Sequence, residues 1–351
     1  MTRARRPQKK RVLFICGSMN QTTQMYRIAS ELPDYECVFT PYYCDGIIET
    51  LRRMGLMEFT IIGQQWRKSC LAYLTEHHVA IDFGGARGPY DLVLTCQDLF
   101  IPTNVRGSKG LLVQEGMTDP EGLGYWLVKR FPFLPRYIAS TAATGLSGWF
   151  DRFCVASEGY AELFAKKGID PSKLVVTSIP NFDDCASYLH NDFPHRGFVL
   201  VCTSDARETF KLHNRRAVLE SAVRFARGRP LIFKLHPNEK VERAKREIKQ
   251  LAPEALVYTS GCAEHMIANC EALVTEFSST AFVGIALDKE VHSAAFTLDE
   301  LRRLMPLQNK CAARNIASVC RDLLNDGAKH ALPASKRAEP AWWADAAVMV
   351  P

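Results

Sequence analysis

Short apolar segments alternate with amphipathic segments along most of the chain. In the first half, the apolar segments predict strands at residues 11–16, 37–42, 91–96, 110–116, 152–157 and 173–180. A turn is expected at 17–23, and helices are expected at 24–32 and 158–167. Strands that alternate with helical segments of about ten to fifteen residues are typical of repeated βαβ units. The pattern therefore predicts an α/β fold with parallel sheets.

The same pattern restarts after a polar segment at residues 190–197, which we expect to be a linker. Strands are predicted at 197–203, 231–235, 255–259 and 273–275, and helices at 214–227, 239–251, 263–269 and 279–287. We therefore expect two Rossmann-like domains, 11–190 and 191–330, that face each other across a cleft. A basic flexible arm at 1–10 and a C-terminal tail at 331–351 complete the chain. The tail contains Trp342 and Trp343, and we expect it to pack back on the body as a helix, because large exposed aromatics are disfavoured.

One predicted strand ends in the polar segment Lys234 to Asn238. Alternation along the strand puts Lys234 and His236 on one face, and Pro237 stops the strand. Ligands of open α/β sheets bind beyond the carboxyl ends of the strands. An imidazole there can donate a hydrogen bond to a phosphate oxygen or a proton to a leaving group. The ordinary alternative is a histidine that only caps the strand.

A second predicted strand ends in Glu276, followed by Ser278, Ser279 and Thr280. These hydroxyls would stand at the start of a helix, where hydroxyl and backbone N–H groups together favour an anion. A helix cap would explain one serine, but not two serines and a threonine. Glu276 is placed to reach the ribose hydroxyl of a nucleotide. The two strand ends together therefore predict a nucleotide site in which the hydroxyls and His236 hold the phosphates.

Two further segments carry candidates. Thr203, Ser204 and Arg207 follow the first predicted strand of the second half, and Arg207 would offer a forked donor to a phosphate. A solvated turn is an equal alternative for that segment. In the first half, Glu115 follows a strand beside Gly116, as expected of a base that takes a proton from an attacking hydroxyl. A surface glutamate at a turn is an equal alternative there.

Other nucleotide and metal motifs are absent from the sequence. Residues 17–20 do not begin a Gly-x-Gly-x-x-Gly segment and no Walker A segment occurs, which argues against dehydrogenases and P-loop proteins. The twelve cysteines are scattered without a Cys-x-x-Cys pair, so we expect reduced thiols, a reducing cytoplasm and no zinc site. No Asp-x-Asp element stands at a strand end to hold a metal and a diphosphate, and we expect no metal and no cofactor. The hydrophobic share of 47% is typical of soluble globular proteins, and no apolar run is long enough to span a membrane.

In the order and spacing of these motifs, residues 90–290 resemble a group of bacterial GT-B glycosyltransferases that carry an HP and an SS motif. His236-Pro237 matches the HP motif and Ser278-Ser279 matches the SS motif. The group includes capsule polysialyltransferases, Kdo transferases and CDP-glycerol glycerophosphotransferases. The resemblance implies a GT-B fold and a transferase that binds a nucleotide-activated donor.

The segment Gln114-Glu115-Gly116 is similar to the acidic-Gly motif of the sialyl members, with Gln114 in place of an acid. The resemblance implies an inverting, metal-independent transfer in which His236 and the serines hold the donor phosphate and Glu115 deprotonates the acceptor. The implied substrates are a CMP or CDP type of donor and a surface polysaccharide or glycolipid acceptor, with a sugar or a polyol phosphate transferred.

Two alternatives to a transferase stay open. Residues 157–184 and 236–238 also look like those of non-hydrolysing UDP-GlcNAc 2-epimerases, although the Ser-Gly-Gly-x-x-Glu-Glu element of that family is replaced here by residues 276–280. The other alternative is a non-catalytic nucleotide-sugar binding protein, which would bind a nucleotide without turnover.

Positive charge recurs along the chain, whose net charge is +6. Residues 125–150 combine cations with aromatics, and we expect this segment to contact an anionic acceptor or a membrane surface. This contact would place the protein at the inner face of the membrane, and the reduced cysteines predict a cytoplasmic location. The motifs and the resemblance predict a nucleotide-sugar donor, and we expect no nucleic-acid partner.

Overall fold

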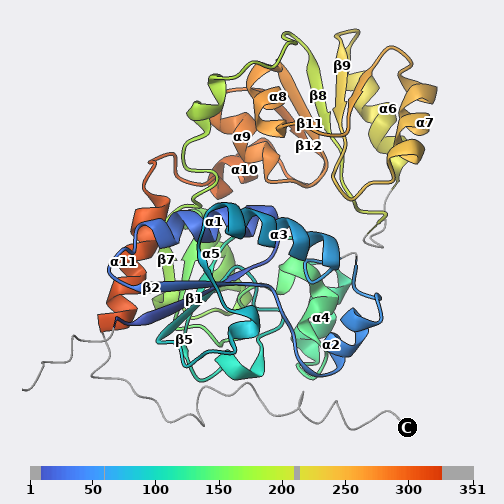
Figure 1. The fold of residues 1–351 in the computed structure, drawn as a ribbon. Coiled ribbons are helices and arrows are strands. Elements are labelled where there is room, and N and C mark those ends of the chain that lie inside the picture. The colour runs from blue at the N-terminus through green and yellow to red at the C-terminus, as the bar shows by residue number, and fades with distance from the viewer. Residues whose placement is uncertain (1–8, 59, 209–213, 326–351) are drawn as a thin grey trace, which may run out of the picture. The chain divides into compact units, whose positions relative to one another are not determined.

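The chain divides into two compact units. The computed structural model describes residues 9–58, 60–208 and 214–325. Its first unit comprises the described residues up to Asn181 together with those from Asn309 onward, and its second unit is Phe182–Gln308 (Figure 1). Each unit contains one parallel sheet covered by helices. The predicted α/β fold with two Rossmann-like units is confirmed.

The sheet of the first unit has seven strands in the order β3-β2-β1-β4-β5-β6-β7. Every neighbouring pair is parallel, and the order reverses between β1 and β4, as in a Rossmann sheet. The strands are β1 (Arg11–Cys16), β2 (Glu36–Pro41), β3 (Ala80–Ile81), β4 (Leu92–Thr95), β5 (Lys109–Val113), β6 (Arg152–Val155) and β7 (Leu174–Val176).

The helices of the first unit include one that starts earlier than the sequence pattern predicts. Residues 17–23 do not form a turn, because the Ser18 side chain accepts a hydrogen bond from the Gln21 backbone N–H and caps α1 at Met19. The α-helices are α1 (Met19–Ser30), α2 (Gly46–Arg53), α3 (Gln64–Glu76), α4 (Leu123–Arg130), α5 (Glu158–Lys167) and α11 (Ala312–Asn325). Short 3-10 helices are η1 (Phe83–Gly85), η2 (Thr103–Val105), η3 (Arg136–Ala143) and η4 (Pro171–Lys173).

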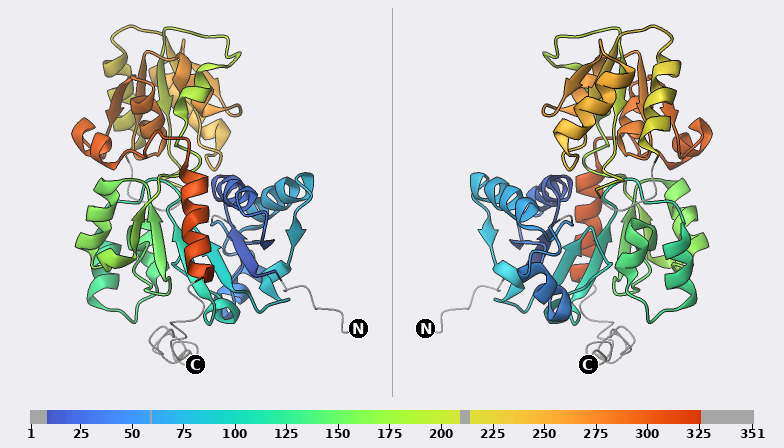
Figure 2. Two further views of the ribbon diagram at one scale, coloured as in Figure 1. Left: turned by 90° about the vertical axis from the view of Figure 1, so that its left-hand side faces the viewer. Right: turned by 90° about the vertical axis from the view of Figure 1, so that its right-hand side faces the viewer.

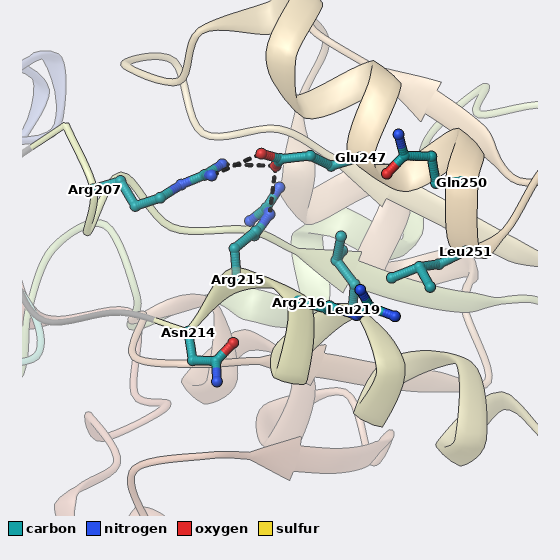
Figure 3. A pocket seen from close by; sticks show the side chains of 8 residues that line it. All are labelled: Arg207, Asn214, Arg215, Arg216, Leu219, Glu247, Gln250 and Leu251. Carbon is teal, nitrogen blue, oxygen red and sulfur yellow. Dashed lines mark hydrogen bonds and ion pairs between the residues drawn. The ribbon is translucent and has the colours of Figure 1, made fainter.

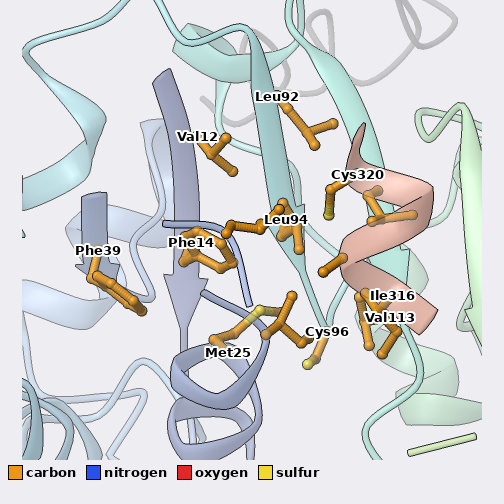
Figure 4. Packing of buried hydrophobic residues seen from close by; sticks show 14 of the residues in the cluster. Val12, Phe14, Met25, Phe39, Leu92, Leu94, Cys96, Val113, Ile316 and Cys320 are labelled. Atoms are coloured by element: carbon orange, nitrogen blue, oxygen red, sulfur yellow. The ribbon is translucent and has the colours of Figure 1, made fainter. Parts of the chain in front are cut away.

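The last helix of the described chain completes the core of the first unit. Figure 4 shows Ile316 and Cys320 of α11 directed towards Leu94 and Val113 of the sheet, and all four side chains are fully buried. The helices α1 and α3 contribute to the same apolar cluster. Figure 2 shows α11 lying along the strands of this unit. The first unit is therefore built from both ends of the described chain.

These boundaries differ from the expected domains 11–190 and 191–330. The first unit ends at Asn181, whose side-chain amide donates to the Asn20 carbonyl at 2.8 Å and so ties it to α1. Residues 309–325 belong to the first unit instead of the second, because the apolar face of α11 is buried on the first sheet. Residues 1–8 of the expected arm and the whole expected tail at 331–351 lie outside the described residues.

The sheet of the second unit has five strands in the order β10-β9-β8-β11-β12, and all neighbouring pairs are parallel. The strands are β8 (Val199–Cys202), β9 (Leu231–Lys234), β10 (Leu256–Tyr258), β11 (Ala272–Thr275) and β12 (Glu290–Ser293). The sequence pattern missed β12, because Val291 is its only aliphatic residue.

The helices of the second unit are α6 (Arg215–Ala226), α7 (Val241–Leu251), α8 (Ala263–Asn269), α9 (Thr280–Ala286) and α10 (Leu298–Leu304), with one 3-10 helix, η5 (Cys185–Leu189). The helices α6 and α7 bury Leu219 and Ile248 against Phe233 of β9. One face of the sheet is therefore closed by these two helices.

The buried cysteines of both units behave as small apolar side chains. Burial raises the pKa of Cys154 in β6 and of Cys202 in β8 to about 12. These thiols therefore stay neutral near neutral pH. Among the helices in the described ranges, none has the length and apolar character needed to cross a bilayer.

Truncating the α11 contact should destabilise the first unit. Ile316→Ala removes a fully buried side chain and leaves a cavity, so we expect the free energy of unfolding to fall by about 2–5 kcal/mol. The control Ser318→Ala, at an exposed position on the same helix, should change it by less than about 0.5 kcal/mol. Urea denaturation measures both, and equal stability of the two variants would show that α11 does not support the core.

Candidate functional site

The loop after β8 joins the two strand ends that flank it. β8 lies between β9 and β11, where the strand order of the second sheet reverses. Ser204 donates a hydrogen bond to the Glu276 carboxylate, which follows β11. Asp205 Oδ2 accepts one from Asn238 Nδ2, which follows β9, at 2.8 Å. The structure therefore brings together candidates from three strand ends, and it adds Asp205, which the sequence analysis did not single out.

The imidazole of His236 is oriented by its own loop. Its Nδ1 accepts a hydrogen bond from the Asn238 backbone N–H at 3.2 Å and lies 3.7 Å from Asp205 Oδ2. A neutral imidazole whose Nδ1 accepts carries its proton on Nε2. The side chain is 36% exposed, so Nε2 can donate to a ligand at this edge of the sheet.

The turn that carries His236 is fixed by a buried carboxylate, that of Glu239. The Glu239 side chain is 1% exposed, and its Oε2 accepts hydrogen bonds from the His236 backbone N–H, at 2.9 Å, and from the Thr203 hydroxyl. Its Oε1 lies 2.9 Å from Nη2 of Arg215, a side chain that is only 5% exposed. A buried charge is tolerated when it is paired and hydrogen-bonded. Glu239 therefore holds the ends of β8 and β9 together and positions His236.

Neither member of this ion pair was predicted. Glu239 was expected to be the first residue of the helix 239–251, and Arg215 fell within the preceding predicted helix, 214–227, where it was not singled out. The only signal in the sequence is an acidic residue in the turn directly after His236. Nothing in the spacing indicates that it is buried or that its partner lies on α6.

The serine and threonine candidates lie at the start of α9. Ser278 Oγ accepts hydrogen bonds from the Thr280 backbone N–H at 3.3 Å and from the Thr280 hydroxyl at 3.0 Å. Ser279 is the residue that precedes the first helical residue. Since Ser278 Oγ accepts from Thr280, its own hydroxyl proton can be donated to a ligand. The Ser278 hydroxyl thus also satisfies one of the free backbone N–H groups at the start of α9.

Two predicted phosphate-binding residues have other partners. Lys234 is buried, and its Nζ donates to the Leu235 carbonyl at 3.0 Å. Arg207 forms two hydrogen bonds of 2.8 Å with the Glu247 carboxylate on α7, and these bonds lower the pKa of Glu247 below its ordinary value. The structure therefore joins Arg207 to α7 instead of to the group around His236.

Glu115 lies at the carboxyl edge of the first sheet, beside the start of α1. Its Oε1 accepts from Ser18 Oγ at 2.7 Å and its Oε2 accepts from Gln21 Nε2 at 2.5 Å. A Cβ atom on Gly17 would lie only 2.2 Å from Gln21 Oε1, so a larger residue at this position would displace the Gln21 side chain that donates to Glu115. The residues that orient Glu115 come from the segment that was predicted to be only a turn.

Gln114, the departure from the acidic-Gly motif, is buried and connects two strand ends. Its Nε2 donates to the Gly116 carbonyl and its Oε1 accepts from the Ala156 backbone N–H, both at 2.8 Å. An amide can make both bonds, whereas a carboxylate only accepts. Within the described residues, no group of three or more His, Cys, Asp or Glu side chains is arranged to hold a metal ion.

No known protein family matches the chain, and no curated protein matches it in sequence. Solved structures do match both units. The wall teichoic acid polymerase TagF superposes with a TM-score of 0.50 and 10% identity, covering 92% of this chain and 90% of that one. The UDP-GlcNAc 2-epimerase from Neisseria meningitidis, bound to UDP-GlcNAc, superposes with a TM-score of 0.54 and 12% identity, covering 89% of this chain and 100% of that one. The chain has the GT-B fold.

A third GT-B match is S. aureus MnaA in complex with UDP, with a TM-score of 0.56 and 13% identity over 91% of this chain and 89% of that one. TagF has also been solved after a soak with CDPG. At these identities, the similarity establishes the GT-B fold of this chain and leaves its substrate to the chemistry of its own residues.

Removing one member of the buried ion pair should destabilise the second unit. Glu239→Gln leaves the Arg215 guanidinium without its carboxylate, so we expect a loss of about 3–5 kcal/mol in the free energy of unfolding. Glu242→Gln, at a side chain that is 83% exposed, is the matched control and should change stability by less than about 0.5 kcal/mol.

The double variant Arg215→Met with Glu239→Leu should recover part of that loss, because no unpaired buried charge remains. Urea denaturation of the single and double variants measures the difference. A double variant that is less stable than Glu239→Gln would contradict the assignment of Glu239 and Arg215 as a compensated pair.

Proposed function

We propose that the chain is a transferase that moves a sugar or a polyol phosphate from a nucleotide donor, of the CMP or CDP type, to an acceptor hydroxyl. The observation that carries the proposal is the orientation of His236, whose Nδ1 accepts from the Asn238 backbone and whose Nε2 is thereby the donor. This imidazole stands where the strand order of a Rossmann sheet reverses, which is where open α/β sheets bind ligands.

In the proposed reaction, the acceptor oxygen forms a bond to the transferred group while the bond to the nucleotide phosphate breaks. The electron pair of the broken bond stays on the phosphate, where hydrogen bonds from His236 Nε2 and the Ser278 hydroxyl stabilise the growing charge. The proton of the acceptor hydroxyl passes to the Glu115 carboxylate, which Ser18 and Gln21 hold in place. Inversion without a metal is what the resemblance of the motifs implies.

An epimerase is the second candidate, because the similarity to the UDP-GlcNAc 2-epimerase from Neisseria meningitidis is as strong as that to TagF. The epimerase and transferase reactions can be distinguished at C2 of the sugar. An epimerase exchanges the C2 proton of UDP-GlcNAc with solvent, so proton NMR in D₂O detects it without an acceptor. A non-catalytic binding protein would bind a nucleotide and show neither exchange nor transfer.

The acceptor side of the proposal is supported by an exposed apolar surface on α4 and the segment after it. Tyr125 and Val128 of α4 are buried against η3. The opposite side of α4 exposes Trp126 by 54% and Leu123 by 77%, and Phe133 beyond it is 58% exposed. Large exposed apolar patches mark interaction sites. Other large apolar side chains of α4 and the segment after it are also exposed, namely Leu127, Phe131, Tyr137 and Ile138.

The exposed cations Lys129 and Arg130 lie at the end of α4, beside these apolar side chains. Apolar side chains together with cations fit the interface of a bilayer that contains anionic lipids. We therefore propose that α4 and residues 131–138 contact the inner face of a membrane that bears the acceptor.

Removing the His236 imidazole should weaken donor binding. We expect His236→Ala to raise the Kd for CDP or UDP about tenfold or more, because a hydrogen bond to a charged phosphate is lost. Glu115→Ala should leave this Kd unchanged and abolish most of the turnover. Isothermal titration calorimetry measures the binding, with His190→Ala, an exposed histidine of the same unit, as the matched control. Equal affinity in His236→Ala and His190→Ala would contradict the assignment of His236 to the donor phosphate.

Reversing the charges at the end of α4 should release the protein from anionic vesicles. Each cation near an anionic surface contributes about 1 kcal/mol, so Lys129→Glu with Arg130→Glu should weaken binding to phosphatidylglycerol vesicles about thirtyfold or more. The control Lys68→Glu with Lys166→Glu makes the same charge change at other exposed positions of the first unit. Co-sedimentation measures the binding of both variants. Equal losses of vesicle binding would indicate that net charge alone, and not this surface, binds the protein to the vesicles.

A further inference from the structure

A cavity of about 700 Å³ opens between α6 and α7 in the second unit. Figure 3 shows Arg207 and Arg215 both directed at Glu247 on its wall, with Arg216 on the first turn of α6. Leu219 and Leu251 give the cavity an apolar wall. The residues that act in the proposed transfer reaction, His236, Ser278 and Glu115, do not line this cavity. That reaction therefore does not explain the cavity.

The lining of this α6–α7 pocket has more cationic than anionic groups. Three arginines line it with one carboxylate, that of Glu247. Both oxygens of Glu247 accept hydrogen bonds of 2.8 Å from Arg207, while Arg215 Nε lies 3.9 Å from the nearer oxygen. Arg216 is 80% exposed and pairs with Glu220, four residues later on the same helix. One carboxylate is therefore shared by two guanidinium groups, and a third lies at the rim.

Arg215 is the buried member of this group. Its side chain is 5% exposed, and Nη2 lies 2.9 Å from Glu239. Its Nε and Nη1 have no hydrogen-bond partner within the described ranges of the chain. An unmet buried donor is unfavourable, and more so on a charged group. An oxyanion in the adjacent cavity would provide the missing acceptors.

We propose that the α6–α7 pocket binds a small phosphate monoester. A guanidinium fork matches two oxygens of a phosphate, and arginine is suited to such buried contacts. The phosphate oxygens would accept hydrogen bonds from Arg215 Nε and Nη1, which have no acceptor among the described residues, and the organic body would lie against Leu219 and Leu251. The cavity falls within the range of about 300–1,000 Å³ that is typical of small-molecule sites, which is larger than inorganic phosphate needs.

Phenyl phosphate is a suitable probe, because it combines the phosphate group with an apolar body. Calorimetry is carried out on His236→Ala, in which the proposed donor site is weakened, so that binding of phenyl phosphate reports mainly on the α6–α7 pocket. Phenyl phosphate should bind, and adding Arg216→Glu should weaken it about tenfold or more. Adding Arg224→Glu, an exposed arginine near the other end of α6, should leave the affinity unchanged.

Gln250→Glu, at an exposed position of α7 on the rim of the same cavity, is an independent second variant and should also weaken binding. Equal affinity in the Arg216→Glu and Arg224→Glu variants, or no binding of phenyl phosphate to His236→Ala, would overturn the proposal. Phenol should not bind, and its binding at the affinity of phenyl phosphate would also overturn it. Binding of CDP to Arg216→Glu with His236 intact tests the donor site separately, so the two proposals can fail independently.

Discussion

The parallel pairing of β8 with β9 on one side and with β11 on the other determines where polar chemistry gathers in the second unit. Because all three strands run the same way, their carboxyl ends meet at one edge. The crossovers to the two neighbours leave on opposite sides, so the loop after β8 can reach the loops after both. The hydrogen bonds of Ser204 to Glu276 and of Asn238 to Asp205 follow from this constraint. The first sheet brings Glu115 and Ser18 together in the same way.

The polar residues at this edge depend on buried charge for their geometry. Glu239 contacts the backbone of the His236 turn, the Thr203 hydroxyl and the guanidinium of Arg215, and its own side chain is 1% exposed. A buried ion pair adds little net stability compared with apolar residues, but losing one partner is strongly destabilising. The pair is therefore better understood as fixing one geometry for the His236 turn than as a source of stability for the fold.

Much of the fold could be predicted from the sequence, because a strand that is buried on both faces of a parallel sheet must be a continuous apolar run. The strand β12 has one aliphatic residue and gave no such signal. The strand-end candidates could be found because the carboxyl ends of parallel strands share an edge. The partners of Arg207 and Glu239 could not, since each lies on a neighbouring helix whose packing depends on the whole sheet.

The placement of α11 also had no signature in the sequence, because an apolar stripe shows that one face of a helix is buried but not which sheet covers it. Its burial among β4 and β5 means that the first unit is interrupted by the second in the order of the chain. Domains fold as units, and usually in the order in which the ribosome makes them. Here the second unit, Phe182–Gln308, is synthesised completely before Ile316 exists. The unit that begins first is therefore the last to close its core, and until then it exposes the apolar surface that α11 covers.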